Sequence, residues 1–171
     1  YAPGSTISAP ITLSGSCVKT NTTYSLYLSN ASGSFASRTL IGTFKNFYAT
    51  FVNGVIPAGT PAGNGYKVEV ISANPAVTSS ISAPFTINAG TGVTASIGSV
   101  PISSNYPEVF GTCSGVNNTS YSFTNFSTPG ATVTATFFNE LTQASEGTIT
   151  PKTAGTSFTA KAAHYTISVR A

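Results

Sequence analysis

The chain has 171 residues, of which 40% are hydrophobic and only 6% are charged, whereas about 25% of residues in an average soluble domain carry a charge. This apolar content supports a packed core and excludes an intrinsically disordered chain. The net charge of +3 comes from basic residues scattered along the sequence, which argues against nucleic-acid binding, because that function needs a clustered basic stripe.

The first half of the sequence predicts short β-strands separated by turns. Alternating apolar and polar residues indicate strands at 7–13, 24–28, 40–44, 47–52, 66–70 and 81–87. In the second of these strands, Tyr24, Leu26 and Leu28 form the set that faces the core. Pro10 restricts the first strand to a sheet edge or a bulge.

A turn cassette at 57–65 leads directly into an amphipathic strand, and together they are the strongest fold signal in the chain. The cassette is rich in proline and glycine and ends in the turn dipeptide Asn-Gly. In the strand that follows, we expect Tyr66, Val68 and Val70 to face the core and Glu69 to face solvent. A tight corner before a strand led by tyrosine is typical of immunoglobulin-like sandwiches.

The second half of the sequence predicts another unit of the same kind, after a small and flexible linker at 88–92. Its strands are expected at 93–97, 121–123, 131–138, 147–149, 157–159 and 165–169. No stretch shows a convincing helical period. We therefore predict an all-β fold of two tandem antiparallel β-sandwich, immunoglobulin-like domains, with boundaries 1–89 and 93–171.

An internal repeat indicates that the two domains are related. In the leading register, the second copy lies 96 to 99 residues after the first. The matches of this register are Gly15-Ser16-Cys17 with Gly111-Thr112-Cys113, Tyr24 with Tyr121 and Tyr66 with Tyr165. A rival register sets Ala2-Pro3-Gly4 against Cys113-Ser114-Gly115, and it implies two β units that are not close copies.

Each predicted unit lacks one strand that the other has. The second unit has a leading strand at 93–97, and the first has a closing strand at 81–87. An open apolar edge is an aggregation liability. We therefore expect the ends to be completed by the next module of a longer polypeptide or by a strand from another copy. The first residue is Tyr1 rather than Met, which indicates processing of a longer chain.

Several longer words of the first unit carry a family resemblance. They are YAPGS at 1–5, LSNASGSF at 28–35, IGT at 41–43 and IPAGTPAGNGYKVEVISANPAVTSS at 56–80. Residues 1–89 resemble the sandwich repeats of very large cell-surface and secreted proteins of Bacteroidota, including gliding-motility adhesins of the SprB type. Residues 93–171 resemble a divergent immunoglobulin-like or PKD-like module of such proteins.

This resemblance implies an extracellular, cell-surface β-sandwich array that is exported by the type IX secretion route. Such arrays serve as a stalk, filament or adhesin, and the family offers no catalytic residues to carry over. The chain departs from the family at Ala2, where a Cys is common.

Cys17 and Cys113 are the only cysteines of the chain. An even count in a secreted protein favours a disulfide. Equivalent points of tandem units, however, lie much farther apart than the roughly 5.5 to 6 Å between Cα atoms that a disulfide needs. The sequence leaves three alternatives for these cysteines: a bond between Cys17 and Cys113, two buried thiols, or bonds to neighbouring modules.

The inventory of reactive residues argues against an enzyme. His164 is the only histidine, and the chain has no Asp, so a Ser-His-Asp triad is excluded. We interpret the four glutamates as surface carboxylates rather than as a glycosidase pair. Two thiols alone form no zinc site. We expect no catalytic residue, no metal and no cofactor.

Aromatic side chains are the remaining candidates for ligand binding. Phe137 and Phe138 are adjacent in a predicted strand, so one of them must point away from the core. Tyr48 lies in a segment that is rich in aromatic residues. We expect exposed aromatic contacts among Tyr48, Phe137 and Phe138.

Two functions from different classes remain. The leading hypothesis is a non-enzymatic structural or adhesive module of an extracellular filament, whose partners are neighbouring copies or modules. The alternative is a carbohydrate-binding accessory module of a secreted polysaccharide-degrading enzyme, with surface polysaccharide as the partner. No apolar run approaches the roughly 20 residues that span a bilayer, so we expect no membrane span.

Overall fold

The computed structural model describes residues 1–14, 21–45, 49, 51–99, 101, 109–111 and 119–171. All regular structure in these residues is β, in several antiparallel sheets, which confirms the predicted all-β fold class and is consistent with β-sandwiches. The described residues contain no helix of the length and apolarity that a bilayer crossing requires. The chain divides into two compact units, Tyr1–Val93 (unit 1) and Thr94–Ala171 (unit 2), which are described separately.

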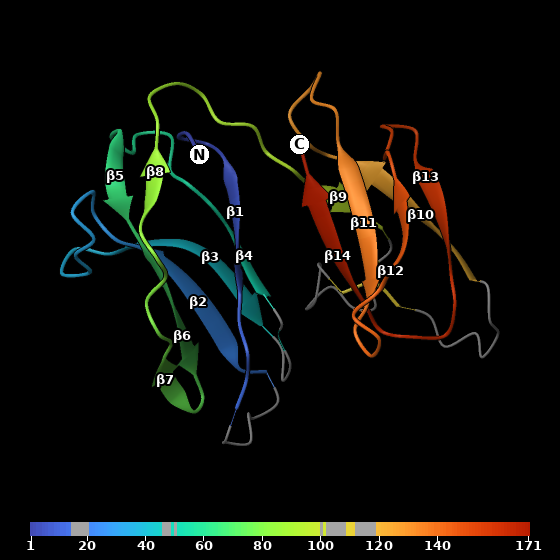
Figure 1. The fold of residues 1–171 in the computed structure, drawn as a ribbon, viewed down its shortest axis with the longest axis horizontal. Helices are drawn as coiled ribbons and strands as arrows, with labels where there is room; N and C mark the ends of the chain where they lie inside the picture. Colours follow the sequence, from blue (N-terminus) through green and yellow to red (C-terminus); the bar gives the residue numbers. More distant parts are fainter. Residues whose placement is uncertain (15–20, 46–48, 50, 100, 102–108, 112–118) are drawn as a thin grey trace. The chain divides into compact units, whose positions relative to one another are not determined.

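Unit 1 contains three groups of paired strands (Figure 1). The central group is a four-stranded sheet in the order β3-β2-β6-β7, and the other two groups are the pairs β1-β4 and β5-β8. The strands are β1 (Thr6–Pro10), β2 (Thr23–Leu28), β3 (Thr39–Lys45), β4 (Phe51–Val55), β5 (Gly63–Tyr66), β6 (Val68–Ala73), β7 (Ala76–Thr78) and β8 (Phe85–Ile87).

The core of unit 1 forms around β2, as the alternation in its sequence predicts. Tyr24, Leu26 and Leu28 are all buried, with at most 2% of each side chain exposed. Val52 of β4 and Ile87 of β8 are fully buried in the same cluster. Complete burial of an aliphatic side chain of this size stabilises a fold by about 1.5 to 3 kcal/mol, so this cluster dominates the stability of the unit.

The predicted strand 66–70 is two strands in the structure. β5 ends at Tyr66 and β6 begins at Val68, because the backbone between them bonds to a neighbouring loop instead of a strand. The Lys67 amide donates to the Ser29 hydroxyl, and the Ser29 amide donates to the Lys67 carbonyl. The prediction that Tyr66, Val68 and Val70 are buried is confirmed.

The expected orientation of Glu69 toward open solvent is wrong. Only 6% of its side chain is exposed, because the Arg38 side chain covers the carboxylate. The closing strand expected at 81–87 is also shorter than predicted and consists of β8 alone, preceded by an irregular segment.

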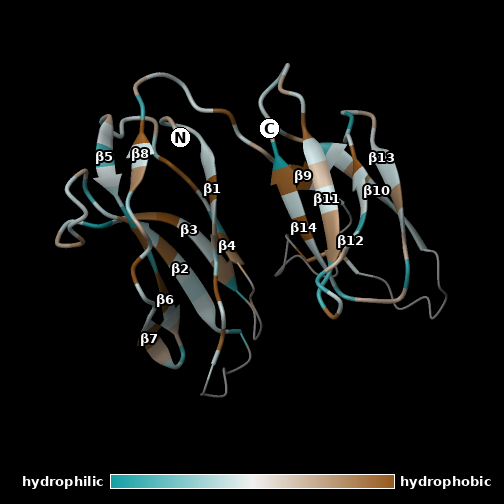
Figure 2. Ribbon diagram, in the orientation of Figure 1, coloured by the Kyte–Doolittle hydropathy of each residue, from teal (hydrophilic) through white to brown (hydrophobic). Residues whose placement is uncertain are grey.

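Unit 2 contains two three-stranded sheets, in the orders β13-β10-β9 and β12-β11-β14. The strands are β9 (Ile97–Gly98), β10 (Thr119–Asn125), β11 (Thr134–Asn139), β12 (Ser145–Ile149), β13 (Thr156–Ala160) and β14 (Tyr165–Arg170). The leading strand expected at 93–97 is therefore only two residues long. Apolar and polar segments alternate along the strands of both units in Figure 2.

Aromatic side chains make up most of the core of unit 2. Phe123 and Phe137 are buried with 2% of their surface exposed, and their ring centroids lie 5.3 Å apart. Phe158 stacks on Phe137 at a centroid distance of 3.8 Å with nearly parallel planes. Several apolar residues at the rim of this core, including Ile167 and Val169, are only partly buried.

Strand pairing supports the rival register at β2 and contradicts the match of Tyr24 with Tyr121, but it keeps the leading register's match of the strand after Tyr66 with the strand at Tyr165. β1-β4 and β3-β2-β6 in unit 1 correspond in chain order to β10-β13 and β12-β11-β14 in unit 2. Shifting the chain by the separation of Ala2 and Cys113 carries Thr23–Leu28 onto Thr134–Asn139. The leading register instead equates β2 with β10, although β2 pairs with β6 and β10 does not pair with β14.

Two buried tyrosines of unit 1 provide a matched test of this packing. The Tyr66 hydroxyl donates to the Pro61 carbonyl at 2.7 Å, whereas the buried Tyr24 hydroxyl has no hydrogen-bond partner in the described residues. We predict that Tyr66→Phe lowers the free energy of unfolding by about 1 kcal/mol and that Tyr24→Phe leaves it unchanged or raises it. Urea denaturation of both variants measures the two effects, and an equal loss in both would contradict the prediction.

Candidate functional site

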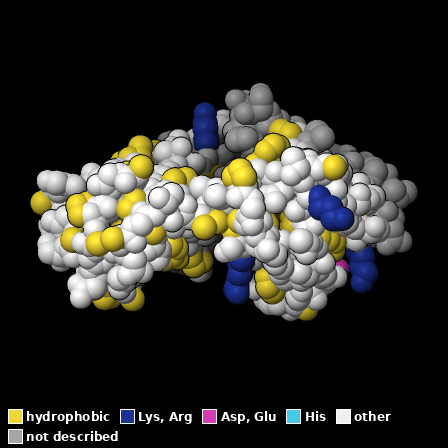
Figure 3. Space-filling model, turned by 90° about the horizontal axis from the view of Figure 1, so that it is seen from above, with side chains coloured by type: hydrophobic (Ala, Val, Ile, Leu, Met, Phe, Trp, Pro, Cys, Tyr) yellow, Lys and Arg dark blue, Asp and Glu magenta, His cyan; other side chains and the backbone are white. Residues whose placement is uncertain are grey.

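No group of three or more His, Cys, Asp or Glu side chains that could hold a metal ion occurs in the described residues. His164 is exposed and contributes only its backbone carbonyl, which accepts from the Glu140 amide. Glu69 forms an ion pair with Arg38, and Glu140 and Glu146 accept hydrogen bonds from residues near β14. On the face drawn in Figure 3, the Lys and Arg side chains are isolated from one another.

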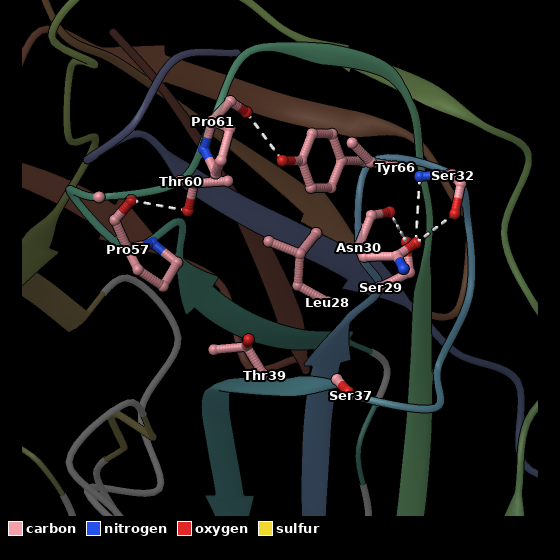
Figure 4. Close-up of a pocket in the computed structure, with 12 residues that line it drawn as sticks. Leu28, Ser29, Asn30, Ser32, Ser37, Thr39, Pro57, Thr60, Pro61 and Tyr66 are labelled. Carbon is pink, nitrogen blue, oxygen red and sulfur yellow. Dashed lines mark hydrogen bonds between the residues drawn. The ribbon is translucent and has the colours of Figure 1, made fainter.

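A pocket of about 600 Å³ lies in unit 1 between the turn after β2 and the loop that follows β4 (Figure 4). Its lining has no charged side chain and combines hydroxyl groups with apolar ones. The lining residues are Leu28, Ser29, Asn30, Ala31, Ser32, Ser37, Thr39, Pro57, Gly59, Thr60, Pro61 and Tyr66.

Most polar groups of this pocket hold its own loops in place. The Asn30 side-chain oxygen accepts from both the amide and the hydroxyl of Ser32, at 3.0 and 2.8 Å. The Thr60 hydroxyl donates to the Pro57 carbonyl at 2.8 Å. The Tyr66 ring is 98% buried, so it offers no face on which a sugar ring could stack. The pocket is therefore mainly the corner that the proline and glycine cassette builds before β5.

Glu69 and Arg38 form a partly buried ion pair on the outer face of the four-stranded sheet. The distance between Arg38 Nη1 and Glu69 Oε1 is 2.9 Å. The Arg38 guanidinium also lies over the Tyr27 ring, 4.6 Å from its centroid. Tyr27 and Glu69 are directly opposite each other on β2 and β6, so the guanidinium clamps a cross-strand pair.

A second polar cluster ties β14 to the hairpin of β11 and β12. Glu146 accepts hydrogen bonds from the Asn139 amide group and from the Tyr165 hydroxyl, both at 2.8 Å. These two donors lower the pKa of Glu146, because they favour its ionised form. Burial and the hydrogen bond to Glu146 raise the pKa of Tyr165. The neighbouring Glu140 accepts from the Thr166 hydroxyl at 2.8 Å.

The edge of β14 that faces away from β11, called here the open edge, has no strand partner in the described residues. The Glu140 amide donates to the His164 carbonyl, and the ladder from there to Arg170 has no irregularity. Hydrogen-bonded and non-bonded pairs alternate in such a ladder, so the backbone N–H and C=O groups of Tyr165, Ile167 and Val169 point away from β11. These groups form the open edge.

The corresponding edge of β6 in unit 1 is closed by two serines. The Ser79 amide donates to the Val70 carbonyl, and the Ser79 hydroxyl accepts from the Val70 amide, at 2.8 and 3.0 Å. Ser82 makes the same pair of bonds with Val68, both at 3.0 Å. Val68 and Val70 are buried in the core of unit 1, whereas Ile167 and Val169 are partly exposed.

The usual defences of an edge strand are missing from β14 between Tyr165 and Val169. This stretch has no charged residue and no proline, and its register with β11 has no bulge. The outer edges of β4 and β13 have no strand partner within the described ranges, so these edges do not distinguish the two units. The open edge of β14 is thus the feature that most needs a functional explanation.

The aromatic contact residues expected from the sequence fare differently. Phe138 is 36% exposed and Phe137 is 2% exposed, so one of the two points outward, as predicted. The proposal of Phe137 itself as a surface contact is wrong, because its ring is stacked on Phe158 inside unit 2. Tyr48, Cys17 and Cys113 lie outside the described residues.

Sequence reasoning missed the serine bonds that close the edge of β6. Ser82 falls inside the predicted strand 81–87 and Ser79 lies just before it, but nothing in the sequence indicated that their hydroxyls bond to the backbone of β6. Comparisons with protein-family models, curated proteins and solved structures gave no match for this chain.

Removal of the Arg38 side chain tests the ion pair. We predict that Arg38→Ala lowers the free energy of unfolding by about 1 to 3 kcal/mol, because it leaves the Glu69 carboxylate buried without a partner. Arg38→Lys retains the charge but loses the planar contact with Tyr27, so we expect an intermediate loss. In urea denaturation, the double variant Arg38→Ala/Glu69→Gln should be more stable than Arg38→Ala alone, and an additive loss would refute the pairing.

The pH dependence of unfolding tests the Glu146 cluster. A carboxyl whose pKa is lowered on folding stabilises the fold above its unfolded pKa, which is 4.5 for Glu146, and loses this effect as the pH falls through its folded pKa. We therefore predict that Glu146→Gln lowers the melting temperature at pH 7 and that the difference from the wild type disappears in acid. A difference that stays constant from pH 7 down to acid would contradict this prediction.

Proposed function

We propose that the chain is a non-enzymatic structural and adhesive module of an extracellular surface filament or giant adhesin. In this role its two units act as immunoglobulin-like sandwiches, and the open edge of β14 is completed by a strand from a neighbouring module or copy. The single observation that carries the proposal is that the edge of β6 is closed while the corresponding edge of β14 is unpaired in the described residues.

The energetics of strand edges support this assignment. Each outward N–H or C=O group loses its water partners when another surface covers the edge, so only a strand that bonds to them can bind there without a penalty. The partly exposed apolar side chains of Ile167 and Val169 would gain burial at the same time. Addition of a strand to an exposed sheet edge is a known mode of protein association.

The chemistry of the surface is consistent with an adhesive or structural role outside the cell. The described residues hold no cluster that would bind a metal, and the low charge leaves a surface of hydroxyl and amide groups. The resemblance of residues 1–89 to Bacteroidota cell-surface repeats suggests export by the type IX route and a role in gliding motility or attachment. Antiparallel ladders running through both units would carry tension along such a filament.

A carbohydrate-binding accessory module is the second candidate. It is favoured by one observation, the neutral and hydroxyl-rich lining of the pocket near Asn30. It is disfavoured by the burial of Tyr66 and Phe137, which removes two rings from any stacking platform. Titration of the chain with neutral polysaccharides separates the two candidates, because only the accessory module depends on such binding.

Amide hydrogen exchange tests the proposed role of the open edge in the full chain. We predict that the amides of Ile167 and Val169 exchange at least about tenfold faster than those of Val68 and Val70. The reason is that the Ile167 and Val169 amides have no hydrogen-bond acceptor in the described residues. A synthetic peptide of residues 76–87, the segment that covers β6 and β5, should slow exchange at Ile167 and Val169. Exchange at these two amides that is already slow and is unchanged by the peptide would refute an open edge.

Electron microscopy of the native assembly tests the wider function. Repeating fibres built of small β units are the expected result. Dispersed molecules that bind polysaccharide would instead favour the accessory module.

A further inference from the structure

The flank of unit 2 that contains the open edge ends without a further strand in either sheet, within the described residues. β12 and β13 are in contact, so β14 and β9 occupy the opposite side of the unit. Ile97 of the short strand β9 and Ile167 and Val169 of β14 are packed only partly at the rim of the core. This flank therefore combines outward backbone groups with apolar side chains, a combination that suits a further strand as its partner.

The outward backbone groups of β14 are arranged symmetrically about Ile167. Tyr165 and Val169 lie two positions before and after it, and the residues between them bond to β11 instead. In an antiparallel pair, two opposite residues exchange both backbone hydrogen bonds only if the groups of both residues face the partner. If a second β14 lies with its Ile167 opposite the first, Tyr165 of each copy meets Val169 of the other and every outward group has a partner.

Other registers of two β14 strands satisfy fewer of these groups. A shift by one residue sets outward groups against residues whose backbone already bonds to β11. A shift by two residues leaves Tyr165 or Val169 opposite a residue that lies outside β14. The edge is thus complementary to itself in one register.

The charges near the ends of β14 favour the antiparallel direction. Arg170 at the end of the strand is exposed, and the Glu140 carboxylate accepts from Thr166 near its start. Glu146 lies at the same start, with Lys161 at 4.0 Å. Antiparallel pairing brings Arg170 of each copy to the end of the partner strand that carries Glu140, whereas parallel pairing would set two arginines side by side.

The side chains of β14 also suit a second copy of the same strand. Alternation places Tyr165, Ile167 and Val169 on the core face and Thr166 and Ser168 on the other face. Antiparallel pairing sets Ile167 beside Ile167 and Val169 beside Tyr165, which extends the apolar core of unit 2 across the contact. On the other face it sets Thr166 beside Ser168, and no charge lies between them.

We propose that the open edges of two copies of the chain pair with each other in the antiparallel direction, with the two Ile167 residues opposite each other on a twofold axis. This inference rests on the proposed function and names the partner of the open edge. The contact is isologous and uses the open edge of both copies, so the assembly stops at a dimer. In the proposed filament it joins two neighbouring chains side by side.

Sedimentation equilibrium of the full chain tests the stoichiometry. We expect a mass that rises with concentration and levels off at that of a dimer. Ile167→Pro removes an outward amide from β14 and keeps the hydrogen bonds to β11, so it should dimerise at least about tenfold more weakly. Ile167→Val keeps the amide and should dimerise as the wild type does. Growth beyond a dimer, or an unchanged dimer in the proline variant, would overturn the twofold contact.

Cysteine trapping tests the register without the proline variant. Opposite residues in such a pair have Cα atoms about 5.5 Å apart, which a disulfide can span. Ile167→Cys should therefore give a disulfide-linked dimer under mild oxidation. Val169→Cys is the matched control, because it lies on the same face but about 14 Å along the strand from its own copy. It should link no more than the wild type with its two native cysteines. Equal linking of both variants would overturn the proposed register.

Failure of this inference can be distinguished from failure of the proposed function. Pairing would itself protect the amides of the open edge, so hydrogen exchange is measured at a concentration where the chain is monomeric. A wild type that stays monomeric at all concentrations, while the peptide of residues 76–87 still protects Ile167 and Val169, would overturn the second copy as the partner and leave the open edge in place. A monomer whose open edge also ignores the peptide would overturn both.

Discussion

Satisfaction of backbone hydrogen bonds at the outer strand of a sheet is the constraint on which this structure depends. Each unit has a central strand, β2 or β11, whose partners on both sides are strands of the same chain. One step farther out, the two units differ. Two serines bond to the backbone of Val68 and Val70, whereas the outward groups of Ile167 and Val169 have no described partner. The side chains differ in the same way: those of Val68 and Val70 are buried, whereas those of Ile167 and Val169 are only partly buried.

Features governed by local periodicity could be predicted from the sequence. The alternation of Tyr24, Leu26 and Leu28 is a property of six consecutive residues, and their burial depends on little else. Burial of Glu69 could not be predicted, because the residue that covers it, Arg38, is 31 positions away. The break at Lys67 depends on Ser29, which is also distant in sequence. Short matching words wrongly equated β2 with β10, since only strand pairing shows which strands are equivalent.

The candidate site was also only partly predictable, because composition can be read from the sequence whereas contacts between distant residues cannot. The absence of Asp excludes a Ser-His-Asp triad from composition alone. The missing closing strand of unit 2 could be expected from the sequence, but which backbone groups of β14 face outward depends on its register with β11. The few charged residues serve the fold: Arg38 and Glu69 clamp two strands, and Glu146 holds Tyr165 at the first position of β14.

Closure of the β6 edge by Ser79 and Ser82 depends on a very short part of the sequence. This part, residues 79–84, is six residues long, lies outside the core, and leaves Ile81 largely exposed. Its gain or loss therefore alters one edge without disturbing the buried residues on which folding depends. A closed edge and an open edge of otherwise similar sheets are therefore separated by a short segment that lies outside the core.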